Sequence, residues 1–168
     1  TATVGDVTRT EQYNSKTTEL TIDLAAENPK LEIIDLMLVV DVTGSMGDEL
    51  RYLSSELSNV VETLSAKHAN ATINLALLFY RDNGDSEKFS YYDFLDVTDQ
   101  NNLKAQINAI KAQSATGGGD YPEAVDEALE LAVSKQWSSG ASTKMIFFVL
   151  DAPPHDSRAE FIRRYLDA

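Results

Sequence analysis

Runs of consecutive apolar residues alternate along the chain with segments in which apolar residues recur every three or four positions. A continuous run rich in β-branched and aliphatic side chains is typical of a strand that is buried on both faces of a sheet. Runs of this kind occupy residues 31–40, 71–80 and 144–150. The turn-forming segment RDNGDSE and the aromatic stretch 88–94 follow the second run, and they predict a further strand at an edge of the sheet.

The segments with recurring apolar residues predict helices with one buried face. They cover residues 47–67, residues 100–112, a stretch from Ala124 to Val133, and a last stretch that begins near Ser157. Strands that alternate with helices favour a parallel sheet covered on both faces. The pattern therefore predicts an α/β fold, with a doubly wound, mostly parallel central sheet flanked by helices.

The N-terminal part of the chain has a different pattern. Residues 1–16 are polar and rich in threonine, which predicts a loop or an extended arm, whereas residues 17–24 alternate as a half-buried strand does. We therefore expect residues 1–30 to form an arm and a strand that lead into a domain over residues 31–168.

Composition narrows the classes of function. The chain has 168 residues, 43% of them apolar, which suits one domain with a substantial core. Its net charge of −13 disfavours nucleic acid and anionic lipid as partners, because both are bound by basic surfaces. The absence of cysteine excludes disulfides, thiolate metal sites and cysteine nucleophiles. No apolar run approaches the roughly 18 residues of a membrane helix, so we expect no membrane insertion.

Oxygen-bearing side chains follow three of the predicted elements. The first apolar run is followed by DVTGSMGD, which contributes Asp41, Thr43 and Ser45. Thr116 stands in the glycine-rich segment SATGGGDYPEA, and Asp151 directly follows the last run. Ligands of open α/β sheets bind outside the carboxyl ends of the strands, so we expect these three loops to meet. Two carboxylates and three hydroxyls suit Mg²⁺, and also Ca²⁺ or Mn²⁺, better than Zn²⁺.

The same residues resemble a known family. DVTGS is similar to the Asp-x-Ser-x-Ser signature of the von Willebrand factor A domain, and Thr116 and Asp151 match that family's later threonine and aspartate. The segments FYRDNGD, GGGDYPEA and LDAPPH resemble a subgroup found in bacterial A-domain proteins and beside alpha-kinase domains. The resemblance extends from about Ile33 to His155.

The resemblance implies a metal-ion-dependent adhesion site. Thr43 and Ser45 would bind the cation directly, Thr116 would do so when a ligand is present, and Asp41 and Asp151 would act partly through water. One coordination position would stay open for an Asp or Glu side chain of a protein partner. The signature's first serine is Thr43 here, and this residue keeps the hydroxyl and adds a methyl group.

The resemblance also implies a rim and a longer fold. Residues that would border the partner are Gly44, Met46, Gly118, Asp120 and His155. Members of the family usually continue beyond the last aspartate with at least one more strand and helix. We therefore expect the fold to lack its C-terminal strand and helix.

Simpler structural roles are open for several of these residues. Asp41 could cap the helix that begins near Met46. Asp120 and Glu123 could be extra ligands, but their spacing, with Pro122 in the first turn, favours a capping box. Residues 117–119 could suggest a phosphate cradle, but no Walker lysine follows them. His155 could be a polar loop residue rather than part of the rim.

Taken together, the sequence predicts a metal-dependent protein-interaction module and not an enzyme. One alternative is a Mg²⁺-dependent phosphotransferase or hydrolase with Asp41 as nucleophile, although the haloacid-dehalogenase type needs a second aspartate where Thr43 stands. A scaffold that binds nothing is the other alternative. The chain begins at Thr1, and residues 1–30 resemble the strand before A domains of bacterial surface proteins. We therefore expect a secreted or cell-envelope bacterial protein, with a cytoplasmic protein as the alternative.

Overall fold

The computed structural model describes residues 2–4, 7–10, 32–119, 121–155 and 163, and the chain divides into two compact units, 1–31 and 32–168. In the first unit β1 (Ala2–Val4) pairs antiparallel with β2 (Val7–Arg9). This short ladder corrects the prediction of a loop or an extended arm for that region. The strand predicted over 17–24 lies outside the described residues. Of the helix predicted from Ser157 only Arg163 is described, and it is helical.

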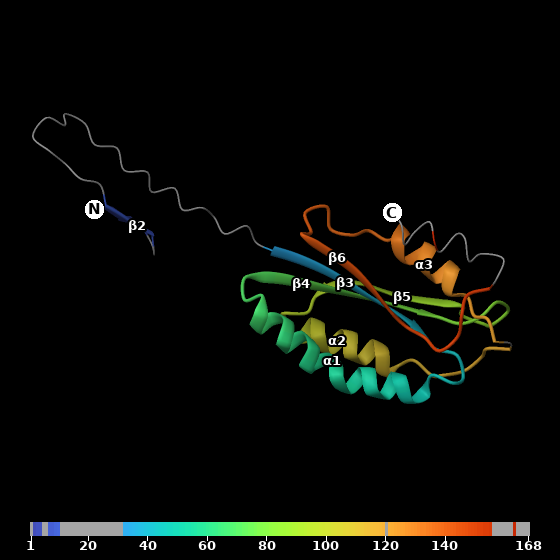
Figure 1. Ribbon diagram of the computed structural model, residues 1–168. Coiled ribbons are helices and arrows are strands. Elements are labelled where there is room, and N and C mark those ends of the chain that lie inside the picture. The colour runs from blue at the N-terminus through green and yellow to red at the C-terminus, as the bar shows by residue number, and fades with distance from the viewer. Residues whose placement is uncertain (1, 5–6, 11–31, 120, 156–162, 164–168) are drawn as a thin grey trace, which may run out of the picture. The chain divides into compact units, whose positions relative to one another are not determined.

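The second unit is built on a four-stranded sheet (Figure 1). Its strands are β3 (Glu32–Asp41), β4 (Ala71–Tyr80), β5 (Phe89–Asp96) and β6 (Thr143–Val149). They lie in the order β5-β4-β3-β6. β3 is parallel to both β4 and β6, whereas β5 is antiparallel to β4 at the edge. The predicted fold class, a mostly parallel sheet with an aromatic edge strand, is confirmed.

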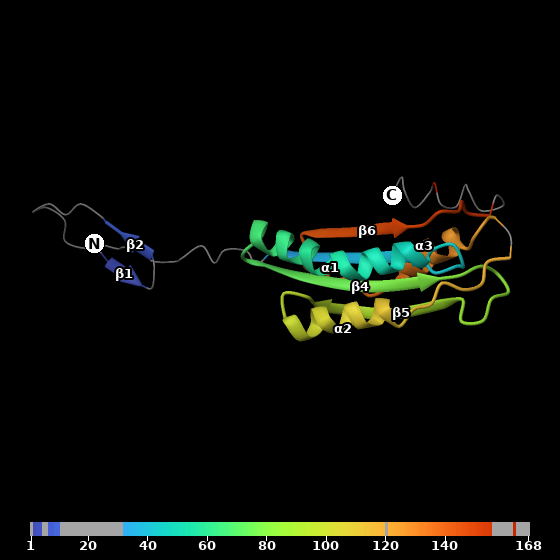
Figure 2. The ribbon, with the colours of Figure 1, turned by 90° about the horizontal axis from the view of Figure 1, so that it is seen from below.

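Helices cover both faces of this sheet. They are α1 (Gly47–Lys67), α2 (Gln100–Lys111) and α3 (Val125–Ser134). The two views in Figures 1 and 2 show α1 and α2 side by side on one face and α3 on the other. Among the described helices, none combines the length and the apolar character needed to cross a lipid bilayer.

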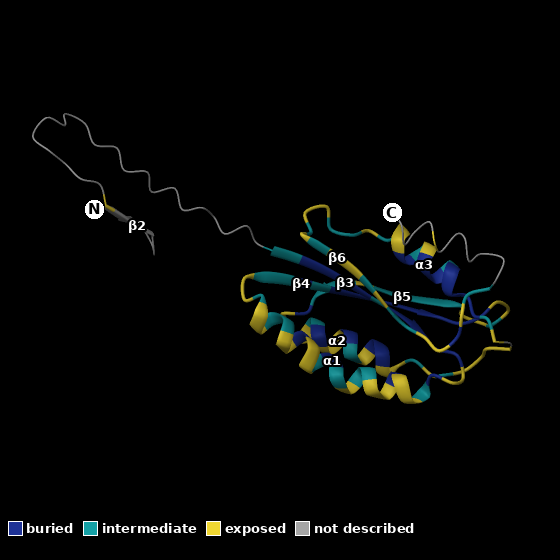
Figure 3. Ribbon diagram, in the orientation of Figure 1, coloured by how far each residue is buried: buried dark blue, intermediate teal, exposed yellow. Residues whose placement is uncertain are grey.

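The alternation of side chains along β3 divides the core into two layers. Leu36 and Val40 belong to the cluster that packs against α1 and α2, whereas Met37 and Val39 belong to the cluster that packs against α3. Successive side chains of a strand point to opposite faces, so a strand between two helical layers must be apolar at nearly every position. Figure 3 shows β3 and β4 as mostly buried, as their sequences predicted.

The prediction that the strand over 144–150 is fully buried is wrong. Within the described residues β6 pairs with β3 alone, and this leaves Met145 38% and Phe147 48% exposed. A continuous apolar run shows that a strand belongs to a sheet, but it does not show whether a second strand lies beside it. Met145 and Phe147 therefore line a groove, whereas Ile146 and Phe148 pack against the core cluster that includes α3.

The N-terminus of α3 also differs from the prediction. The capping box placed Glu123 in the first helical turn, but the helix begins at Val125, and its N-cap Ala124 makes no side-chain capping bond. The backbone N–H of Glu123 donates to Pro153 O at 2.9 Å, and Glu123 forms a parallel bridge with Pro154. Because its backbone is paired with the segment after β6, Glu123 cannot belong to the helix. Asp120, the other half of the predicted box, lies outside the described residues.

Candidate functional site

The carboxyl ends of β3, β4 and β6 lie at one edge of the sheet, because these strands are parallel. The loop after β3 is joined there to the threonine loop, residues 114–119. Gly44 N–H donates to Gly117 O at 3.2 Å, and Thr116 N–H donates to Val42 O at 3.0 Å. The first and second loops predicted from the sequence therefore lie side by side.

Asp41 organises the turn that leaves β3. Its Oδ1 accepts hydrogen bonds from the backbone N–H of Thr43 at 2.8 Å and from the Thr43 hydroxyl at 2.7 Å. Aspartate side chains commonly form such turns with the residue two positions later. The N-cap of α1 is Met46, and no side-chain capping bond is made there. The alternative that Asp41 caps the helix is therefore wrong.

The second carboxylate oxygen of Asp41 is buried and has no hydrogen-bond partner among the described residues. Burial raises the pKa of Asp41 and the charge of Asp151 adds to this rise, whereas the two bonds from Thr43 and the nearby Tyr80 hydroxyl lower the pKa in part. Burial also raises the pKa of the neighbouring Tyr80. The negative charges of Asp41, Glu123 and Asp151 raise this pKa further. The carboxylates of Asp41, Glu123 and Asp151 therefore lie near one another at this edge, and a bound cation would relieve their mutual repulsion.

A cavity of about 320 Å³ opens beside these groups. It is lined by residues of all three loops: Thr43, Gly44, Ser45, Gly117, Gly118, Tyr121, Glu123, Asp151 and Ala152. The structure thus brings together three of the predicted ligands, Thr43, Ser45 and Asp151. Asp41 lies below them, fully buried. Thr116 is joined to the first loop through its backbone, but it is not among the residues that line the cavity.

The predicted rim is only partly found at the cavity. Gly44 and Gly118 line it, whereas Met46 is 1% exposed and packs inside the protein. The prediction that Met46 borders a partner is therefore wrong, because its apolar side chain turns inward at the start of α1. His155 Nε2 lies 2.7 Å from Oδ1 of the buried Asp82, so this histidine ties its loop to another part of the fold. Asp120 is not described.

Glu123 belongs to this site, although its spacing from Asp120 favoured a role as part of a helix cap. Glu123 is 4% exposed and is one of the residues that line the cavity. A Cβ atom at Gly118, where φ is +76°, would lie 2.8 Å from Glu123 Oε1. The carboxylate therefore sits directly against the threonine loop. Its position three residues after Asp120 and directly after Pro122 suggested a helix cap. Its backbone pairing with Pro154 of the third loop is what brings it to the cavity.

The donors at the cavity fit a hard divalent cation. Within the described part of the chain, no three His, Cys, Asp or Glu side chains are grouped so that they could hold a metal ion by themselves. The cavity is lined instead by two hydroxyl-bearing residues, Thr43 and Ser45, and two acidic residues, Asp151 and Glu123. Asp41, bonded to Thr43, has an Oδ2 without a hydrogen-bond partner among the described residues. Mixed oxygen donors of this kind suit Mg²⁺, Mn²⁺ or Ca²⁺.

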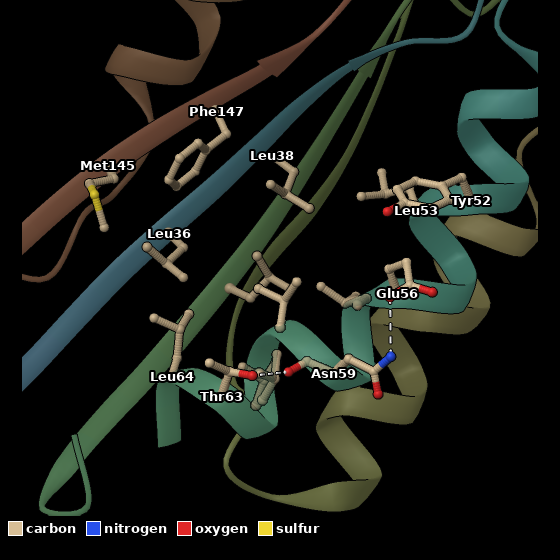
Figure 4. A pocket seen from close by; sticks show the side chains of 15 residues that line it. Leu36, Leu38, Tyr52, Leu53, Glu56, Asn59, Thr63, Leu64, Met145 and Phe147 are labelled. Carbon is tan, nitrogen blue, oxygen red and sulfur yellow. Dashed lines mark hydrogen bonds between the residues drawn. The ribbon is translucent and has the colours of Figure 1, made fainter. Parts of the chain in front are cut away.

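A second, larger cavity of about 580 Å³ has a different character. Figure 4 shows it between the sheet and α1, with Leu36 and Leu38 from β3, Met145 and Phe147 from β6, and Leu53 from α1 turned toward it. Its few polar residues lie on α1, where Asn59 donates to Glu56 Oε2 at 3.1 Å. The cavity is a hydrophobic groove beside β6, and none of the predicted ligands lines it.

Two comparisons with known sequences agree with this geometry. A model of the von Willebrand factor A domain matches residues 35–161. The chain is 30% identical to the alpha-protein kinase vwkA of Dictyostelium discoideum over 125 residues, 74% of this chain and 19% of that protein. It is 33% identical to the putative ariadne-like RING finger protein R811 of Acanthamoeba polyphaga mimivirus over 134 residues, 78% of this chain and 12% of that protein. The chain thus spans less than a fifth of either relative.

Solved structures show the same fold. The pilus adhesin SpaC from Lactobacillus rhamnosus GG superimposes with a TM-score of 0.59 at 15% identity, over 73% of this chain and 16% of SpaC. The open conformation of SpaC gives 0.56 at 17% identity, over 73% of this chain and 15% of SpaC. The family model covers most of the chain, and the fold and the order of the three loops agree with it. This chain therefore belongs to the von Willebrand factor A domain family.

Proposed function

We propose that this chain is a protein-interaction module that binds an acidic side chain of a partner through a divalent cation. The observation that carries the proposal is the setting of Asp41. Asp41 is fully buried, one of its carboxylate oxygens has no hydrogen-bond partner among the described residues, and Thr43, Ser45 and Asp151 line the neighbouring cavity. An uncompensated buried carboxylate is costly unless a cation neutralises it.

Thr43, Ser45 and Asp151 would hold the cation, with Asp41 behind them and with Thr116 supplied by the neighbouring loop. Mg²⁺ is the ion we expect, and Ca²⁺ and Mn²⁺ are the alternatives. The cation would supply positive charge at the bottom of an open cavity. Because hydroxyls are neutral donors, they leave more of that charge for an Asp or Glu of a protein partner than carboxylates would.

Enzyme activity is not supported by the described residues. A phosphotransferase would need a basic side chain directed at the substrate, but the guanidinium group of Arg81 donates to three backbone carbonyls instead. Thr43 stands where a second aspartate would be needed. The kinase and RING finger names belong to relatives of which this chain covers only a small share. Placement at the cell surface stays a prediction, as does the cytoplasmic alternative.

The test is isothermal titration of the metal-free chain with Mg²⁺, Mn²⁺ and Ca²⁺, beside Asp41→Ala and Asp151→Ala. We expect saturable binding of at least one cation, and an affinity at least about 100-fold weaker in either variant, because each change removes a carboxylate of the site.

Asp96→Ala is the matched control, since Asp96 makes the same turn with Thr98 far from the cavity. Binding to wild type that persists unchanged in Asp41→Ala would contradict the proposal. So would the absence of any cation binding by wild type.

A further inference from the structure

The loop between β4 and β5 contains the segment RDNGD, residues 81–85, and it contacts the threonine loop. Arg81 is 8% exposed, and its guanidinium group donates hydrogen bonds to three backbone carbonyls. Its Nε donates to Thr116 O at 3.1 Å and its Nη2 donates to Ser114 O at 3.0 Å, while its Nη1 donates to Glu87 O at 3.2 Å. A buried guanidinium group is expensive to desolvate, so its hydrogen bonds to the threonine loop define the position of that loop closely.

Asp85 holds the same loop from another side. Its Oδ2 accepts the backbone N–H of Gly118 at 2.9 Å and that of Asp82 at 3.2 Å. A Cβ atom at Gly117 would lie only 2.4 Å from that oxygen, and φ of Gly117 is +84°. The threonine loop therefore folds tightly around the Asp85 carboxylate, and a side chain at position 117 would prevent this approach.

Asp82 connects the segment to the third loop. It is 3% exposed, and its Oδ1 lies 2.7 Å from Nε2 of His155, four residues after Asp151. The far end of the β4–β5 loop is attached to α3, where Lys88 Nζ lies 2.6 Å from Glu127 Oε2. One short segment therefore touches both loops that face the DVTGS turn across the cavity.

We propose that Arg81, Asp82 and Asp85 are positioning residues that hold the threonine loop and the third loop at the cavity, and that they thereby set its affinity for the divalent cation. The inference rests on the proposed function, because its consequence is measured as cation affinity. It goes further in assigning a role to a segment that contributes no cation ligand. Arg81 and Asp85 bond to the backbone of the threonine loop, and Asp82 contacts the side chain of His155 in the third loop. Such contacts orient loops rather than ligate ions.

The experiment compares Asp85→Ala with Asp85→Asn and with Asp99→Ala. The amide oxygen of asparagine can still accept the N–H of Gly118, so Asp85→Asn should restore the contact. Asp99 is a matched control, because its Oδ1 also accepts two backbone N–H groups, those of Asn101 and Asn102, at the N-terminus of α2. Two readouts are used: ¹⁵N order parameters of the metal-free protein, and the Kd for Mg²⁺ with Mn²⁺ and Ca²⁺ in parallel.

We expect Asp85→Ala to lower the order parameter of Gly118 from about 0.85 to below about 0.6 and to weaken Mg²⁺ binding about tenfold. Asp85→Asn should stay within about threefold of wild type. Asp99→Ala should lower the Tm by a similar amount to Asp85→Ala and leave both readouts unchanged.

Three results would overturn the inference. One is an unchanged order parameter at Gly118 in Asp85→Ala, and another is a mobile loop with wild-type cation affinity. The third is an equal loss of affinity in Asp99→Ala, which would mean that affinity follows global stability. If wild type binds none of the three cations, the proposed function fails. The order parameters then decide separately whether the segment holds the loop.

Discussion

Two Asp-Val-Thr segments of this chain, residues 41–43 and 96–98, fold into the same turn. In both, the aspartate Oδ1 accepts the backbone N–H and the hydroxyl of the threonine, at 2.8 and 2.7 Å in the first and 3.0 and 2.6 Å in the second. In both, the valine is fully buried and donates its N–H to a β4 residue, Tyr80 or Ile73.

The surroundings of the two turns differ. Asp41 is fully buried at the carboxyl edge of the parallel strands, beside Asp151 and Glu123. Asp96 lies at the opposite edge, because β5 runs antiparallel to β4, and it is partly exposed. The comparison teaches that the Asp-Val-Thr turn is a local device for ending a strand. It becomes a candidate ion site only where other loops add oxygen donors and exclude water.

The largest difference between the turns should appear when each threonine hydroxyl is replaced by a methyl group. Thr43→Val removes a donor at the cavity, so we expect Mg²⁺ affinity to fall about 10- to 100-fold in isothermal titration. Thr98→Val should leave the affinity unchanged and lower stability by about 1 kcal/mol, the usual worth of one hydrogen bond. Thr43→Ser keeps the hydroxyl and should bind Mg²⁺ as wild type does. If Thr43→Ser loses affinity as Thr43→Val does, the packing of the methyl group and not the hydroxyl supports binding.

The shared part of the two turns should respond equally. Val42→Ala and Val97→Ala each remove two buried methyl groups from the same core cluster, so each should lower the free energy of unfolding by about 2 kcal/mol. Urea unfolding of the metal-free proteins measures this. A loss confined to one of the two valines would show that the turns are not equivalent as structural elements.

The carboxylate of Glu123 lies near the Asp41 turn and not near the Asp96 turn, so its removal provides a test with a smaller expected effect. Glu123→Gln preserves the shape of a side chain that lines the cavity and removes one negative charge. We expect Mg²⁺ affinity to fall about tenfold, equivalent to about 1.4 kcal/mol. Glu62→Gln, at an exposed position of α1 outside the cavity lining, is the control. Equal affinities of Glu123→Gln and wild type would mean that this carboxylate does not act on the cation.

The smallest change is the replacement of one carboxylate oxygen by an amide. The folded-state pKa of Asp41 is raised, mainly by burial. The folded metal-free protein therefore binds more protons than the unfolded chain between the two pKa values, and its stability falls as the pH rises through that window. In EDTA at pH 7, Asp41→Asn should thus have a higher Tm than wild type.

This advantage should shrink as the pH is lowered toward the unfolded pKa of about 3.9, where the wild-type carboxyl group becomes neutral. Asp96→Asn, at a partly exposed position, should change the Tm little at either pH. A lower Tm for Asp41→Asn at pH 7 would contradict the view that the buried charge is uncompensated in the metal-free protein.

Much of the architecture follows from local sequence. The bounds of α1 and β4 agree with the predicted residues 47–67 and 71–80, because helical and strand periodicities are strong over 21 and 10 residues. The turn at Asp41 and Thr43 is equally local, since a side chain two residues away supplies both hydrogen bonds. The prediction that the loops after the strands meet followed from one rule, that parallel strands end at the same edge of a sheet.

Tertiary structure decided which residues are exposed and which are brought together, because periodicity along the chain does not contain this information. The apolar run of β6 predicts a buried strand, but the exposure of that strand depends on which strands lie beside it. Glu123 has the local signature of a cap, yet its backbone pairs with Pro154 and brings its carboxylate to the cavity. Met46 stands next to the ligands in sequence and points into the core.

The sequence alone determined the fold class, the α1 and β4 bounds and the chemistry of the strand-end loops, because these depend on neighbours along the chain. Only the tertiary structure decided which oxygen atoms share one cavity, since this depends on contacts between segments that lie 30 to more than 100 residues apart.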